Sequence, residues 1–145
     1  MLTCFDVAKY FLSLNNEAEG DLISNLKLQK LVYYAQGFHL ALHDKPLFEE
    51  DIYAWTHGPV VPELYHEYKE YGSGHVPCPE EFDFSILEDA REFLDEIYDT
   101  FGQFSAWKLR NMTHEEPPWR EASDRREVIT HESLKEYFKT QIING

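Results

Sequence analysis

Apolar residues return every three or four positions along most of the chain, as they do on one face of a helix. Six runs show this spacing, and polar or proline- and glycine-containing segments separate them. The runs cover residues 4–12, 24–42, 62–71, 85–101, 105–112 and 130–142. The pattern predicts a mainly α fold: a compact bundle of about six helices, forming one domain over residues 1–145. It allows at most a small β element around Ile52–Trp55.

Residues that cap helices mark where some of these helices begin. Thr3 followed by Asp6 resembles a capping box, in which two side chains bind free backbone N–H groups of the first turn. Ser85 and Glu88 form the clearest such box, and they predict a long helix from that point. The consecutive prolines Pro117–Pro118 indicate the opposite, a corner that excludes regular helix.

The second predicted helix has one apolar stripe and two tyrosines that cannot both belong to it. Ser24 or Asn25 can cap its first turn. Tyr33 and Tyr34 are neighbours, and neighbours on a helix point about 100° apart. We therefore expect one of the two to face another element or a partner. The stripe consists of Leu28, Leu31, Val32, Ala35 and Leu42.

The spacing of apolar residues changes in the middle of residues 52–65, from the pattern of an extended run to that of a helix. Pro62 suits the first turn of that helix, where its missing N–H is not needed. Gly58–Pro59 predicts a rigid corner between the two parts. The extended run is too short to be stable alone, so it needs a second segment to pair with. We expect Trp55, at this hinge, to be mostly buried near the helix over residues 28–42.

The chain is acidic, with 27 Asp and Glu against 13 Lys and Arg and a formal net charge of −14. This charge opposes phosphate attraction, so we expect no nucleic-acid partner. It permits a basic protein partner without predicting one, because a solvated acidic surface is the commoner cause. Cys4 and Cys78 suggest neither a disulfide framework nor a zinc pattern. With no signal-peptide pattern and no apolar run of about 20 residues, we expect a cytoplasmic protein without a membrane partner.

Few residues are spaced for catalysis or metal binding. His39 and His43 share one helical face, but a zinc site needs a third ligand, and none follows at the zincin spacing. Cys78 lies between two prolines in an acidic segment. Nothing in that segment indicates a base that would activate its thiol as a nucleophile. We therefore expect no metal, no cofactor and no catalytic residue. Acidic pairs such as Glu115–Glu116 are expected to be solvated.

Two Thr-His pairs precede proline-containing corners, Thr56–His57 and Thr113–His114. The interpretation we favour is that their side chains satisfy backbone groups at the turns. The alternative is that they line a shared functional surface with Trp55 and Trp119.

Several groups of residues together carry a family resemblance that spans nearly the whole chain. They are Leu28–Gly37 with Pro46–Phe48, Ala54–Trp55 with Gly58–Val60 and Tyr65, Leu109 with Thr113–His114 and Pro118–Trp119, and Tyr137–Phe138. Their combination resembles the SocA-like antitoxin family, whose unit is the Panacea domain. In this resemblance Leu28 and Leu31 suit the core, and Trp55 and Trp119 suit large buried anchors.

The resemblance implies an antitoxin that neutralises a cognate toxin of a bacterial or prophage toxin–antitoxin system by direct protein–protein contact. One branch of the family implies an alternative, an adaptor that delivers its toxin to a Clp-type protease. A further hypothesis comes from the residues themselves. It is a hydrolase that uses His57, His114 or Cys78, and it requires the fold to bring these groups into one cleft.

For a protein partner, we expect a contact surface made by the exposed member of the pair Tyr33 and Tyr34 together with His57, Tyr65 and His114. Interfaces favour exposed aromatic residues over Lys and Glu at their centre. A rigid corner beside His57 would also lose less conformational freedom on binding than a loop would. The alternative is that all these side chains fill the core or the corners.

Overall fold

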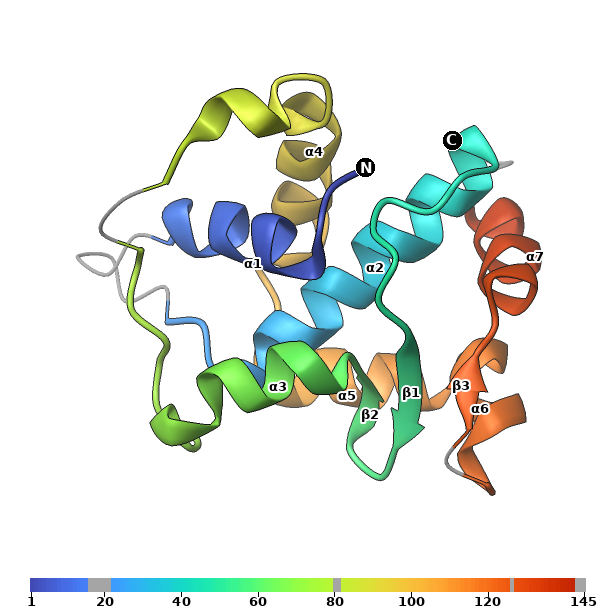
Figure 1. Cartoon of the computed structure of the whole chain (residues 1–145). Helices are drawn as coiled ribbons and strands as arrows, with labels where there is room; N and C mark the ends of the chain where they lie inside the picture. The colour runs from blue at the N-terminus through green and yellow to red at the C-terminus, as the bar shows by residue number, and fades with distance from the viewer. Residues whose placement is uncertain (16–21, 80–81, 126, 143–145) are drawn as a thin grey trace.

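The computed structural model describes residues 1–15, 22–79, 82–125 and 127–142, and within them it is mainly α-helical with one small sheet (Figure 1). The expected fold class is therefore confirmed. The described residues form seven α-helices, one more than expected. These are α1 (Cys4–Ser13), α2 (Asn25–His43), α3 (Pro62–Tyr68), α4 (Arg91–Phe101), α5 (Ala106–His114), α6 (Pro117–Ser123) and α7 (His131–Ile142). Two short 3₁₀ turns, η2 (Lys69–Tyr71) and η3 (Phe84–Leu87), accompany them.

Helix α2 runs through the middle of the molecule, with α1 and α4 on one side and α7 on the other (Figure 1). Most of its side chains are buried, including the predicted stripe from Leu28 to Ala35. Leu42 is an exception, because the last turn extends beyond the core and leaves it 50% exposed. Helix α7 approaches α2 closely at Gly37, where an added Cβ would lie only 2.2 Å from the Phe138 ring.

The N-terminal caps form as predicted for the first two helices. The Thr3 hydroxyl accepts from the Asp6 N–H while the Asp6 carboxylate accepts from the Thr3 N–H, which completes the capping box of α1. Ser24 caps α2 by accepting from the Lys27 N–H.

The prediction of one long helix that begins at Ser85 is wrong for its first part. Residues 84–87 form the short turn η3, and α4 begins only at Arg91. The Ser85 N–H is bound by the Asp83 carboxylate, two residues earlier, so Ser85 is not a helix cap. An aspartate that binds the backbone two residues on favours a tight turn over a helix.

The expectation that two prolines exclude a helix at 117–118 is also wrong. Pro117 and Pro118 form the first turn of α6. The first N–H groups of a helix have no partner within it, so proline costs no hydrogen bond there. This short helix is the one that the periodicity did not reveal.

Three strands form an antiparallel sheet in the order β2–β1–β3, from β1 (Ile52–Trp55), β2 (Gly58–Val60) and β3 (Val128–Ile129). The expected extended run thus finds two partners. The corner lies two residues earlier than expected: Trp55 pairs with Gly58 and Ala54 with Pro59, so Thr56 and His57 form the turn. Pro59 is tolerated because β2 is at the edge of the sheet.

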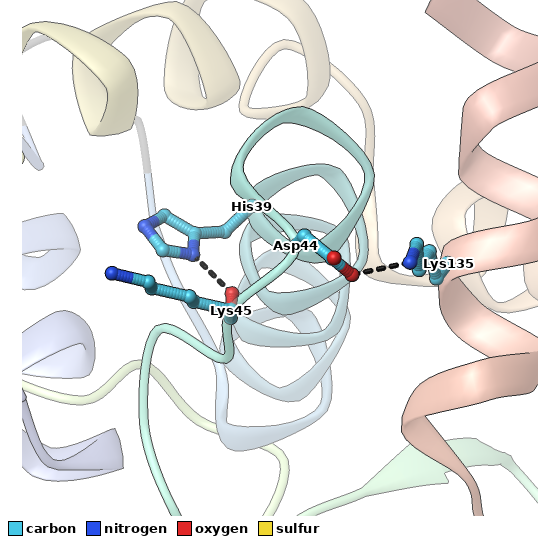
Figure 2. A network of polar contacts seen from close by, with 4 residues as sticks. All are labelled: His39, Asp44, Lys45 and Lys135. Carbon is cyan, nitrogen blue, oxygen red and sulfur yellow. Dashed lines mark hydrogen bonds and ion pairs between the residues drawn. The ribbon is translucent and has the colours of Figure 1, made fainter.

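The far end of α2 is fixed by polar contacts (Figure 2). Asp44 ends the helix in the left-handed conformation, with φ of 58°, and forms an ion pair with Lys135 of α7. The His39 ring bonds the Lys45 backbone oxygen through Nδ1, at 2.7 Å. His39 and His43 lie with ring centroids 4.7 Å apart, but the described part of the chain contains no group of three residues able to hold a metal ion.

Among the described helices, none is both long enough and apolar enough to cross a bilayer.

Candidate functional site

A groove of about 780 Å³ opens between the first turns of α2, the β1–β2 turn, α3 and α5. Two large aromatic side chains of its lining are exposed: Tyr65 is 38% exposed and Trp107 is 60% exposed. Trp55 is half-buried and packs edge-on against Tyr65, with centroids 5.4 Å apart and an angle of 72° between the rings. The other exposed residues of the lining are Thr56, His57, Lys69, Gly72 and Ser73. Trp55 is therefore mostly but not fully buried, because one side faces this groove.

Polar side chains of α2 hold one wall of the groove in place from beneath. Gln29, which is buried, accepts a hydrogen bond from the Val61 N–H through Oε1, at 2.9 Å. It donates through Nε2 to Asn25 Oδ1, and Asn25 Nδ2 donates to the Tyr65 backbone oxygen at 3.1 Å. Because buried polar groups are costly to leave unpaired, this chain of bonds specifies how α3 and β2 sit on α2.

Lys30 is fully buried under the β1–β2 hairpin. Its Nζ donates to the Pro59 backbone oxygen at 3.1 Å, and burial together with the nearby Arg110 lowers its pKa to about 7. Gly58 makes room for it: the glycine has φ of 111°, and an added Cβ would lie 2.7 Å from Lys30 Cε. A glycine is therefore required here both for the backbone angle and for the space.

Behind the hairpin, Trp119 joins α6 to the sheet. Its Nε1 donates to the Trp55 backbone oxygen at 2.8 Å, and its ring stacks on His114 with centroids 3.9 Å apart and 5° between the planes. Burial lowers the pKa of His114, and the positive charges of Arg110, Lys30 and His57 lower it further. Trp119 is half-buried, so the expected anchor role is met by its contacts rather than by complete burial.

The two Thr-His pairs have different environments. Thr113 is buried and its hydroxyl donates to the Arg110 backbone oxygen at 2.8 Å, as expected for a residue that serves the backbone. Thr56 and His57 occupy the exposed hairpin turn. His57 lines the groove, whereas His114 lies behind the hairpin against Trp119.

The expectation that Tyr33 or Tyr34 is exposed is wrong. Tyr33 is 0% and Tyr34 is 1% exposed, because both hydroxyls reach a buried carboxylate instead of solvent. Each donates to one oxygen of Glu116 at 2.8 Å, and Tyr137 of α7 also bonds this carboxylate. Neither tyrosine can therefore contact a partner directly in this structure.

Glu116 is 8% exposed, so the expectation that the pair Glu115–Glu116 is solvated is wrong for this member. Burial raises its pKa to about 7, and the three tyrosine hydroxyls partly offset that rise. The pKa values of Tyr33 and Tyr34 are raised by burial and by Glu116, which keeps both hydroxyls as donors. This cluster joins α2, the start of α6 and α7.

The three residues of the catalytic hypothesis do not meet in this groove. His57 lines the groove, but neither His114 nor Cys78 is among the described residues that line it. Cys78 is exposed, and its thiol contacts only the neighbouring Pro79 backbone oxygen among described residues.

Trp107 is the groove residue that sequence reasoning did not single out as exposed. A signal for it exists: it lies two positions from the buried Leu109, and residues two apart on a helix point to nearly opposite sides. No comparable local signal marks Lys30 or Glu116 as buried, since long charged side chains are rarely fully buried.

Comparison with known proteins confirms the family resemblance. The family described as "Antitoxin SocA-like, Panacea domain" matches residues 28–120. The chain is also 31% identical over 122 residues to the Antitoxin SocA of Caulobacter vibrioides (strain NA1000 / CB15N). That alignment covers 74% of this chain and 64% of the relative, so the chain spans less than two thirds of that protein's length. No solved structure matches the chain.

Proposed function

Because the chain belongs to the SocA-like antitoxin family with its Panacea domain, we propose that it is an antitoxin that neutralises a cognate toxin protein by direct contact. The family match carries this proposal. We further propose that the protein acts in the cytoplasm as a binding protein, with residues 1–145 as a single domain. The shared core formed by α1, α2, α4 and α7 supports the single domain.

The toxin contact is proposed to lie at the aromatic groove. Tyr65, Trp107 and His57 are exposed there, and large exposed aromatic residues are typical of the centre of an interface. The wall that carries Tyr65 and His57 is held by buried hydrogen bonds from Gln29 and Lys30, so little order has to be gained on binding. The proposed contact thus includes two residues of the surface expected from the sequence, His57 and Tyr65.

Co-expression with the product of the neighbouring gene tests the proposal. We expect that product to stop growth when it is expressed alone, and we expect colony counts to recover when this chain is expressed beside it. A tagged toxin should then retain this chain in a pull-down at a constant ratio. A frame-shifted copy of the same gene, which makes the RNA but not the protein, serves as the matched control and should give no protection.

Toxin half-life, measured after translation is blocked, separates neutralisation from proteolytic delivery. Neutralisation by complex formation predicts a half-life that is unchanged or longer beside this chain. The proposal fails if the neighbouring product is harmless alone or equally toxic beside this chain. Recovery with rapid loss of the toxin would instead favour the adaptor alternative.

A further inference from the structure

Two cations flank the aromatic groove of a chain that carries 27 acidic residues against 13 Lys and Arg. Lys69 lines the groove and is exposed, and the Arg110 guanidinium lies 4.5 Å from the centre of the Trp107 ring. Among the described residues, neither Lys69 nor Arg110 forms an ion pair.

The groove itself is free of acidic side chains. None of the described residues that line it is Asp or Glu. Arg110 Nε is also buried without a hydrogen-bond partner among the described residues. The groove is therefore an aromatic surface with a cation in its described lining, Lys69, and a second cation, Arg110, beside it.

We propose that this groove binds a segment of the partner protein in which apolar side chains flank a single carboxylate. The apolar side chains would pack between Trp55, Tyr65 and Trp107, and the carboxylate would pair with Lys69 or Arg110. The inference rests on the proposed function, because it gives the chemistry of the toxin segment at the same groove. A charged hydrogen bond made in a partly dry site contributes more than one made in open water.

A polyanion such as nucleic acid does not fit this arrangement. The net charge of −14 opposes the binding of an extended run of phosphates, which would reach beyond the groove. A partner segment that carries one carboxylate, with neutral or basic residues on either side, meets the cations at the groove and the acidic surroundings at the same time. Charge complementarity at this site thus favours a partner segment with one carboxylate at its centre and neutral or basic residues on either side.

Three capped hexapeptides test the inference: Ser-Leu-Phe-Glu-Leu-Ser and its variants with Gln or Lys in place of Glu. They contain no tryptophan, so binding is followed by the tryptophan fluorescence of the full chain. At low salt, we expect the Glu peptide to bind about ten-fold more tightly than the Lys peptide, with the Gln peptide between them. Raising the salt should reduce this preference, since exposed charges are screened.

Lys69→Glu should reverse the order of the peptides, and Lys69→Gln should weaken the preference without reversing it. Lys45→Glu is the matched control: Lys45 is exposed at the other end of α2, so the same change of charge there should leave the order intact (Figure 2). The melting temperature of each variant confirms that it is folded.

Equal binding of all three peptides, tighter binding of the Lys peptide, or no saturable binding at all would overturn the inference. The growth assay keeps this outcome separate from the proposed function. If wild type protects against the toxin and Lys69→Glu protects equally well, the groove chemistry is wrong and the antitoxin function stands. If no protection is seen while the Glu peptide is preferred, the antitoxin function is wrong and the groove chemistry stands.

Discussion

Trp119 Nε1 donates a hydrogen bond of 2.8 Å to the backbone oxygen of Trp55, and so joins α6 to β1 across 64 positions of sequence. The bond leaves the Trp55 side chain free to form one wall of the groove while its backbone is held from behind. The stack of Trp119 on His114 fixes the indole in the orientation that this bond requires. The placement of the groove wall therefore depends on a residue outside the groove.

Trp119→Phe should destabilise the protein by about 1–3 kcal/mol, because it leaves the Trp55 backbone oxygen without its donor while keeping most of the ring packing. The free energy of unfolding, measured by urea denaturation, checks this. Trp107→Phe is the matched control: Trp107 is 60% exposed, so the same substitution there should change stability by less than about 0.5 kcal/mol. Equal effects at the two positions would contradict the assigned role of the hydrogen bond.

The buried Glu116 should make stability depend on pH around neutrality. Its pKa is raised from 4.5 to about 7 in the folded state, so the folded chain holds this proton more tightly than the unfolded chain does. The associated stability is fully present below the unfolded pKa and is lost as the pH rises toward the folded value. Between pH 4.5 and 7 the loss from this group should be at most about 3 kcal/mol.

Glu116→Gln isolates this effect from the many other acidic groups, since glutamine stays neutral at all these pH values. The unfolding free energy of wild type minus that of Glu116→Gln should fall from pH 4.5 to 7.5 and then level off. Glu115→Gln, on the exposed neighbour, should show no such trend. A difference for Glu116→Gln that is flat, or that rises with pH, would show that the buried carboxylate is ionised throughout.

The helices that local signals mark clearly were predictable from the sequence. Thr3 with Asp6 and the cap at Ser24 both act within four residues, and the structure has both caps. The errors came where one local signal allows two outcomes. Pro117–Pro118 fits a corner and also fits the first turn of a helix. Ser85 can cap a helix, or its N–H can bind the Asp83 carboxylate in a turn.

The polar core could not be predicted, because its partners are distant in sequence. Tyr33 and Tyr34 reach Glu116 from 83 and 82 positions away, and Lys30 reaches Pro59 from 29 positions away. Helical periodicity shows that two adjacent tyrosines cannot share one apolar stripe. It does not show that both hydroxyls will donate to the buried carboxylate of Glu116. For this reason the sequence predicts one member of the tyrosine pair at a partner surface, whereas the structure has both in the core.

Gly58→Ala should destabilise the protein by about 2 kcal/mol or more. The left-handed backbone penalises any side chain there by about 1–2 kcal/mol, and the new Cβ would also press on Lys30 Cε at 2.7 Å. Gly72→Ala is the matched control, since Gly72 also has a positive φ but has open space around its Cα. We expect urea denaturation to show the larger loss at Gly58; equal losses would mean that Lys30 moves aside without cost.

Trp107 and Trp55 should respond differently to truncation, because both face the groove but only one supports the fold. Trp107 is 60% exposed, so Trp107→Ala should keep the melting temperature close to that of wild type and yet reduce protection against the toxin and retention in the pull-down. Trp55 is half-buried and packs on Tyr65, so Trp55→Ala should lower stability by up to about 3 kcal/mol and lose binding as well.

Leu42→Ala is the control for exposed apolar area, because Leu42 is 50% exposed and lies in the last turn of α2, outside the groove. It should affect neither stability nor protection, whereas Trp107→Ala should weaken the complex by at least about 2 kcal/mol if Trp107 is an interface anchor. The size of the effect follows from the size of the ring and from its place in the groove lining beside the Arg110 guanidinium, where a partner would remove it from water. A folded Trp107→Ala variant that protects as well as Leu42→Ala would place the toxin contact on another face of the molecule.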